Sequence, residues 1–201
     1  LTAEWKLAHS VLSSSINLGL LHPTEVVAAV ESAHRRDAAP LSSVEGFIRQ
    51  VIGWREYVWG VYWLWMPAYR TSNVLGATRP VPPAFTGEAP TEMACVANVI
   101  GHVHDHGYAH HIERLMVLGN LALTAPVDPS AMTAWMRESF VDGADWVMLP
   151  NVVGMALFAD GGMMATKPYA SGGAYINKMS DSCRTCRFDP KQRVGPDACP
   201  Y

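Results

Sequence analysis

The positions of the four cysteines place the strongest constraint on how this chain can fold. Cys183 and Cys186 form a C-x-x-C pair, Cys199 follows near the end of the chain, and Cys95 lies far upstream. A C-x-x-C pair can place two thiolates on one metal, and thiolate ligands suit either zinc or an iron–sulfur cluster. A shared site would tie the end of the chain to the segment around Cys95. The alternatives are a thioredoxin-like dithiol and unpaired buried cysteines.

The composition favours a folded protein in a reducing compartment. The 201 residues can form one domain with a substantial core or two small ones, and the 49% hydrophobic content argues against disorder. The formal net charge of -3 predicts no strong general attraction to nucleic acid, although it leaves room for a local basic patch. The longest apolar run, residues 58–69, is interrupted by Pro67 and is too short to span a bilayer. Because the chain begins at Leu1 and no signal peptide precedes the first predicted helix, we expect part of a longer cytoplasmic protein.

Helical signals dominate, and no alternating strand pattern of useful length occurs, so we expect an all-α domain over residues 1–201. Pro23 suits a first helical turn, and Asp128 followed by Pro129 suits an N-cap and first turn. Ser42 and Glu45 have the spacing of a capping box. The segments 78–91 and 160–173 are predicted loops. The predicted helices cover residues 22–36, 42–66, 91–107, 110–123, 128–140 and 151–160.

A histidine-rich stretch, residues 102–111, contains five of the eight histidines. His102, His104 and His106 cannot all share one helix face, so we expect a solvated helix end there rather than a second metal site. His110 and His111 open the next helix, one turn before Arg114. A histidine at that place can cap the helix or donate a proton in a cleft.

Taken together, these features resemble the cryptochrome/photolyase family, and within it the iron–sulfur branch of bacterial cryptochromes and (6-4) photolyases. The resemblance covers essentially the whole chain and implies the C-terminal helical, FAD-binding catalytic domain of that family. The family's N-terminal α/β antenna domain has no counterpart in this sequence, so no antenna pigment is implied. The matching segments are residues 9–23, 45–60, 107–120, 140–162 and 165–186.

The resemblance implies two cofactors, FAD and a [4Fe–4S] cluster. It favours iron–sulfur over zinc and implies that Cys95, Cys183, Cys186 and Cys199 are the cluster ligands, so that residue 95 and residues 183–199 form one site. It implies that His9, Ser10, Val11, Leu12 and Ser13 form the flavin-phosphate loop, with a serine-rich N-cap as the alternative. The remaining flavin contacts that it implies are Gln50, Arg55, Arg114, Asp142, Asp145 and Asn151, with Arg114 and Asp142 as a buried ion pair beside the isoalloxazine.

The resemblance also implies residues for chemistry on UV-damaged DNA. Reduced FAD passes an electron to the lesion after excitation, and His111 with His110 supplies the proton transfer that a (6-4) lesion needs. Tyr169 is expected near the lesion, Trp54 in the substrate cleft, and Trp135 in the photoreduction chain. The sequence departs from the pattern at Met136, at Met148 and in the tryptophan-free segment 78–90. These departures affect the photoreduction route and the tuning of the flavin.

Three functions are open at this stage. The first is a DNA photolyase, a lyase that uses blue light to repair the (6-4) pyrimidine photoproduct. The second is a cryptochrome-type blue-light photoreceptor with the same cofactors and no repair. The third is an iron–sulfur module that binds nucleic acid without catalysis, and a bound flavin would separate it from the other two. We expect a monomer that does not bind membranes.

Overall fold

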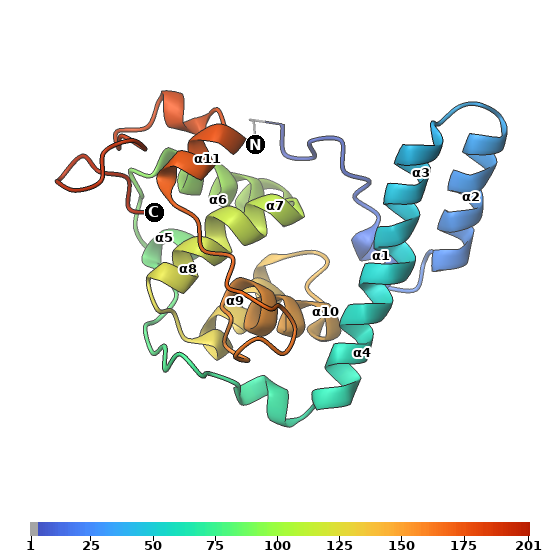
Figure 1. The fold of residues 1–201 in the computed structure, drawn as a ribbon, viewed down its shortest axis with the longest axis horizontal. Helices are drawn as coiled ribbons and strands as arrows, with labels where there is room; N and C mark the ends of the chain where they lie inside the picture. The colour runs from blue at the N-terminus through green and yellow to red at the C-terminus, as the bar shows by residue number, and fades with distance from the viewer. Residues whose placement is uncertain (1–3) are drawn as a thin grey trace.

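The structure, a computed structural model that describes residues 4–201, is built from α-helices, and the predicted all-α class is confirmed (Figure 1). No β-strand occurs in this part of the chain, where only two isolated bridges pair Arg79 with Val127 and Asp189 with Ala198. The α-helices are α1 (Ser13–Asn17), α2 (Pro23–Arg35), α3 (Leu41–Ile48), α4 (Arg55–Trp65), α5 (Pro83–Thr86), α6 (Ala94–His106), α7 (His111–Glu113), α8 (Asn120–Thr124), α9 (Pro129–Ser139), α10 (Asp145–Pro150) and α11 (Gly173–Met179).

Three π-helical turns interrupt or extend these helices within residues 4–201. η1 (Arg49–Trp54) joins α3 to α4, η3 (Arg114–Gly119) joins α7 to α8, and η4 (Asn151–Ala156) continues α10. η4 follows Pro150, whose missing N–H disturbs the regular hydrogen-bond ladder. π-helical turns are rare overall, and many of those that do occur lie at functional sites. Short 3₁₀ turns also occur at η2 (Ala68–Thr71) and η5 (Ser182–Arg184).

The long predicted helices are present with small shifts at their ends. Residues 42–66 correspond to α3, η1 and α4, and residues 110–123 correspond to α7, η3 and α8. Pro23 stands in the first turn of α2, and Asp128 accepts a hydrogen bond from the Ala131 N–H at the start of α9, as expected. Helix α6 begins at Ala94, later than predicted, and ends at His106, with Gly107 as the C-cap that the sequence suggested.

The capping box expected at Ser42 and Glu45 is wrong. The chain enters α3 from Pro40, so Ser42 lies inside the helix, and no side chain caps this end. Glu45 instead pairs with Arg49, one turn further along the same face. A capping box does form at the start of α2, between His22 and Glu25.

Two short helices in or beside predicted loops were missed, and one predicted helix is displaced. Helix α5 is a single turn within the predicted loop 78–91, and α11 forms just after the glycine-rich segment that closes the predicted loop 160–173. Helix α10 begins at Asp145, so the helix predicted for residues 151–160 starts earlier and ends at Ala156. Elements of one or two turns carry too few residues to show a hydrophobic period.

One core joins the helices of the described chain. Figure 1 shows α3, η1 and α4 as one long helix along one side, with α2 beside α3 and with α4 against α10. The centre holds Val58 of α4, Val96 of α6, Leu118 of η3 and Leu149 of α10, each at most 1% exposed. Burying such a side chain contributes about 1.5–3 kcal/mol, so this packing fixes the elements that carry the candidate site.

The end of α6 positions the histidines that follow it. Gly107 has φ = 59°, a left-handed conformation that favours glycine. A Cβ atom at this position would lie 2.7 Å from Cγ1 of Val141, so a larger residue would also clash. The tight turn therefore brings Tyr108 and Ala109 into the core and starts α7 directly after His110.

Within residues 4–201, no helix combines the length and the apolar character that crossing a bilayer requires.

Candidate functional site

Arg114 and Asp142 form a largely buried ion pair at the centre of the candidate site. Arg114 Nη1 lies 2.8 Å from Asp142 Oδ1, and Nη2 lies 3.1 Å from Oδ2. The guanidinium also donates to the Ala109 carbonyl at 2.6 Å and stacks over the rings of Tyr108 and Phe140. The side chains are 14% and 9% exposed, so the charges are paired rather than solvated. The expected ion pair is therefore present, while its place beside a flavin stays a prediction.

The N-terminal segment of the described chain closes over this pair. Ser13 Oγ donates to Asp142 Oδ2 at 2.7 Å, and Asn17 Nδ2 donates to the Asp142 carbonyl at 3.2 Å. Arg55 reaches the same group by donating to Asn17 Oδ1 at 3.3 Å. Four segments far apart in sequence therefore meet, and we call Ser13, Asn17, Arg55, Arg114 and Asp142 the Asp142 cluster. Asn17 was not predicted, although it follows Ser13 by one helical turn.

The loop before α1 has an unusual backbone. Val11 has φ = 54°, a left-handed conformation that is unfavourable for a β-branched residue. Strained residues of this kind persist where the surroundings fix them, often at ligand sites. His9 and Ser10 are exposed, and Val11 and Leu12 are half-buried. Leu12 is the N-cap of α1 and no side chain caps this helix, so the alternative of a serine-rich cap is wrong.

Asp145 belongs to a second polar group beside the Asp142 cluster. Tyr62 donates to its carboxylate at 2.7 Å, and Arg70 and Arg137 form ion pairs with it. Burial raises the pKa of Asp145, but the hydrogen bonds from Arg70 and Tyr62 outweigh this and hold it below the usual range. The neighbouring Trp146 ring lies 4.6 Å from the guanidinium of Arg55, which links the two groups.

Asn151 presents a buried polar atom without a partner. Its Nδ2 donates to the Val147 carbonyl at 2.7 Å, whereas its buried Oδ1 meets no donor among the described residues. Asn151 opens the π turn η4, and Arg114 opens η3. Buried acceptors without a donor are uncommon and often mark a ligand site.

The histidines divide into three environments. His104 is exposed as expected, with its ring 2.9 Å from Asp105. The expectation that His102 is solvated is wrong: it is 8% exposed and lies 3.3 Å from Glu113. It faces inward because it shares a helix face with buried Val99 and Cys95. His106 stacks on Trp5, with ring centroids 4.3 Å apart.

His110 and His111 differ sharply although they are neighbours. His110 is fully buried and caps α7 by accepting a hydrogen bond from the Glu113 N–H. Burial, and then the nearby charge of His9, lower the pKa of His110 to about 4. His111 is exposed, and the surrounding protein, followed by the charge of Arg114, lowers its pKa below the ordinary value. Water at the exposed ring limits that lowering.

The remaining predicted residues are spread around these groups. Gln50 is exposed in η1, and Trp54 lies at the end of the same turn, 5.6 Å from the Tyr57 ring. Trp135 contacts Phe140, which in turn lies under Arg114. Tyr169 is 38% exposed in the segment between η4 and α11. No contact between Tyr169 and His111 is found among residues 4–201, and the expected place of Tyr169 near the lesion stays a prediction.

The four cysteines lie in one region of the fold, beside α6 and α11. Burial, and then the charges of Cys183, Cys186 and Cys199, raise the pKa of the Cys95 thiol to about 12. Cys199 packs so closely on α11 that a Cβ atom at Gly173 would lie 2.7 Å from its sulfur. Within residues 4–201 no group of three or more His, Cys, Asp or Glu side chains is arranged to hold a metal ion.

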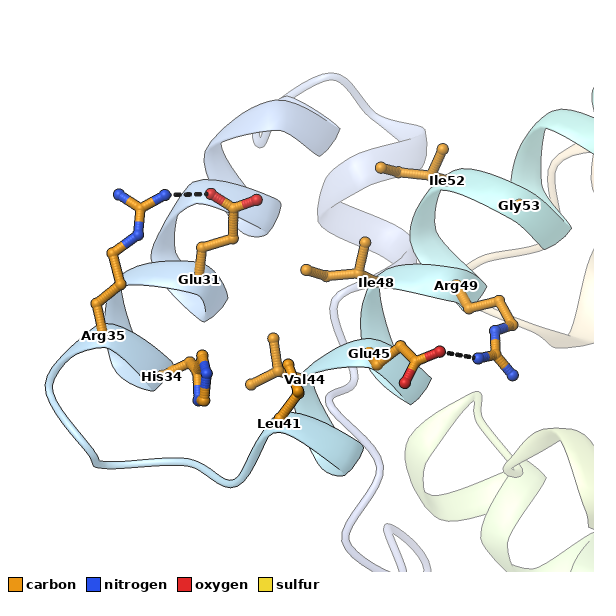
Figure 2. A pocket seen from close by; sticks show the side chains of 10 residues that line it. All are labelled: Glu31, His34, Arg35, Leu41, Val44, Glu45, Ile48, Arg49, Ile52 and Gly53. Carbon is orange, nitrogen blue, oxygen red and sulfur yellow. Dashed lines mark hydrogen bonds and ion pairs between the residues drawn. The ribbon is translucent and has the colours of Figure 1, made fainter.

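A groove of about 600 Å³ lies apart from all of these residues, between α2 and α3 (Figure 2). Its floor is apolar, and the ion pairs Glu31–Arg35 and Glu45–Arg49 flank it. None of the predicted site residues lines it. The candidate site is therefore the Asp142 cluster with its neighbours, and not this groove.

Comparison with known proteins shows which sequences this chain is similar to. The chain is 53% identical over 195 residues to a protein named "(6-4) photolyase" from Agrobacterium fabrum. The matched region covers 97% of this chain and 38% of that protein. It is 42% identical over 66 residues to an uncharacterized protein, R855, of Acanthamoeba polyphaga mimivirus. This second matched region covers 33% of this chain and 54% of that protein. The chain therefore spans about two fifths of the first relative and matches about half of the second. No protein-family model matches the chain.

Proposed function

Because the chain belongs to the cryptochrome/photolyase family, we propose that it forms the flavin-binding part of an enzyme that repairs (6-4) pyrimidine photoproducts in DNA with light. The observation that supports this most strongly is the 53% identity, over 97% of the chain, to a protein named "(6-4) photolyase". The proposed substrate is UV-damaged DNA. A monomeric state and a cytoplasmic setting stay predictions.

The residues of the Asp142 cluster and their neighbours fit FAD. Asn151 Oδ1 is a buried acceptor that awaits a donor, and a flavin ring carries N–H groups that can supply one. Arg114 and Arg55 provide guanidinium groups, and the Ser13 hydroxyl lies on the loop proposed for the phosphates. Ser10, Val11 and Leu12 are the remaining members of that loop. Reduced FAD, when bound, supplies the electron that splits the lesion under light.

The protein's own part in the reaction is to bind, to orient and to move a proton. His111 is exposed, so its ring can meet a substrate, whereas buried His110 supports it from behind. We propose that His111 gives a proton to the lesion and takes it back later. Tyr169 and Trp54 are the proposed contacts to the damaged bases, because both present aromatic rings that stack on unpaired bases.

We further propose that the four cysteines hold a [4Fe–4S] cluster. The charges of Cys183, Cys186 and Cys199 act on Cys95, so the four cysteines lie in one region of the fold. A single zinc ion would hold its sulfur ligands about 3.8 Å apart, since each Zn–S bond is about 2.3 Å. The family resemblance, rather than a spacing of the thiols, favours a cluster, in which each thiolate binds its own iron. Its role would be structural, because it joins the C-terminal segment to α6.

The absorption spectrum of the full-length protein tests the flavin. We expect oxidised FAD in the wild-type protein and a large loss of it in Arg114→Ala and Asp142→Ala. Either change leaves a buried charge unpaired, which costs about 3–5 kcal/mol. Arg35→Ala is the matched control, because its ion pair with Glu31 is exposed and worth less than about 1 kcal/mol.

Two results would contradict this assignment. Full FAD occupancy in both cluster variants would show that the ion pair does not support the flavin. Absence of flavin from the wild-type protein, together with binding to nucleic acid, would favour the iron–sulfur nucleic-acid module instead.

A further inference from the structure

A buried carboxyl group lies directly behind the two histidines. Glu113 is 0% exposed, and the mechanism above assigns it no part. Its Oε2 lies 3.3 Å from Nδ1 of His102, and its Oε1 lies 3.6 Å from Nε2 of His110. A fully buried acidic residue is rare unless it is paired, so its retention in the core needs a reason.

The contacts of His110 fix the position of its proton. Its Nδ1 accepts a hydrogen bond from the Glu113 N–H at 3.4 Å, so Nδ1 is the acceptor nitrogen. In the neutral ring the proton therefore sits on Nε2, which faces Glu113 Oε1. Nε2 of His110 is buried and has no hydrogen-bond partner among residues 4–201, whereas Oε1 of Glu113 is buried and also lies 3.3 Å from Nδ1 of His102. The gap of 3.6 Å exceeds a hydrogen bond, and a small rotation of either side chain would close it.

The groups that face this pair favour its uncharged form. Burial raises the pKa of Glu113, which the charge of His102 partly opposes. Burial, and then the charges of His9, His102 and Arg114, lower the pKa of His110. Burial therefore disfavours a charge pair between His110 and Glu113, so we expect hydrogen bonds to set the geometry of the two side chains.

His110 connects the buried Glu113 with two exposed histidines, His9 and His111. Its ring stacks on the ring of His9, with centroids 4.8 Å apart and planes at 5°. His9 belongs to the loop proposed for the flavin phosphates, and His111 follows His110 directly. An orientation imposed on His110 therefore acts on both sides of the proposed active site.

We propose that Glu113 is a positioning residue of the repair reaction, which holds the His110 ring through Nε2 and thereby sets the places of His9 and His111. This inference rests on the proposed function. Glu113 itself touches neither substrate nor flavin in it. His102 completes the arrangement from α6, where its Nδ1 lies 3.3 Å from both carboxyl oxygens of Glu113.

Two substitutions of Glu113 distinguish a role in positioning His110 from a role in packing the core. Glu113→Met keeps the length of the side chain and removes its acceptor, and Glu113→Gln keeps a neutral acceptor at Oε1. We expect Glu113→Met to melt at or above the wild-type temperature, because an apolar group replaces a buried polar one of similar size. Its repair rate, measured on the full-length protein after chemical reduction of FAD, should fall on the order of 10- to 100-fold. Glu113→Gln should restore most of that loss, and Glu88→Met, an exposed control, should change nothing.

A second measurement does not depend on repair. Nitrogen NMR of the histidine rings should show His110 as the Nε2–H tautomer in the wild-type protein and in Glu113→Gln. In Glu113→Met this signature should be lost or mixed with the other tautomer. Wild-type repair and an unchanged His110 signature in Glu113→Met would overturn the inference, and so would equal repair by Met and Gln variants. Absence of repair by the wild-type protein would instead overturn the proposed function, and the tautomer alone would then decide whether Glu113 positions His110.

Discussion

His111→Ala should repair (6-4) photoproducts about 10²–10⁴-fold more slowly than the wild-type protein, because it removes the proposed general acid and base. The variant should keep its flavin, its cluster and its affinity for damaged DNA. Its stability should change by less than about 0.5 kcal/mol, since the side chain is exposed. His110, and not His111, caps α7, so the substitution removes no cap. Repair rate and Tm are measured on the same preparation.

The lowered pKa of His111 adds a condition to this prediction. In the free protein the ring is mostly neutral at pH 7, because the surrounding protein and Arg114 disfavour the imidazolium. Phosphates of bound DNA favour the charged form and raise the pKa again. The proton donor therefore forms mainly in the complex. His104→Ala is the control, since His104 is 86% exposed and has no proposed role. Full repair by His111→Ala, or equal losses in both variants, would contradict the assignment.

Replacing any one of Cys95, Cys183, Cys186 or Cys199 with serine should abolish the iron content and give poorly folded or insoluble protein. The segment after α11 contains only one short 3₁₀ turn, and its residues are mostly exposed or half-buried. It therefore has little core of its own, and the proposed cluster would supply much of its attachment to α6. Metal binding and folding are coupled in such segments. Iron and zinc are measured by elemental analysis of anaerobically purified protein.

Thr185→Ala is the matched control for these variants. Thr185 lies between the two cysteines of the C-x-x-C pair and is exposed, so its substitution should leave iron and solubility unchanged. Zinc without iron in the wild-type protein would contradict the cluster. Serine variants that stay soluble, with normal Tm, would show that the cysteines do not hold the C-terminal segment.

The sequence predicted the long helices well because their apolar residues repeat at helical spacing. It did not reveal the π turns η1, η3 and η4, because one π turn hardly changes the spacing of the apolar residues along the sequence. Yet four predicted site residues, Gln50, Trp54, Arg114 and Asn151, lie in these turns. The turns change the direction of the side chains that follow them, which a period of 3.6 residues cannot describe.

The polar contacts of the site were predictable only in part. The pairing of Arg114 with Asp142 followed from the family resemblance and from the cost of an unpaired buried charge. The partners of Asp145, which come from three other elements, could not be predicted, because they depend on how those elements pack. The inward position of His102 could have been predicted from its spacing to Val99 and Cys95, which outweighs the polar character of its neighbours.

Blue-light repair of a DNA duplex that carries one (6-4) photoproduct, measured with the full-length protein after reduction of its FAD, tests the proposed function most directly. A dark sample and a duplex with a cyclobutane dimer are the controls. We expect the (6-4) photoproduct to be restored to intact bases in the light, and neither control to be repaired. A flavin-loaded, fully reduced protein that leaves the (6-4) photoproduct unchanged in the light would contradict a repair enzyme and favour the photoreceptor.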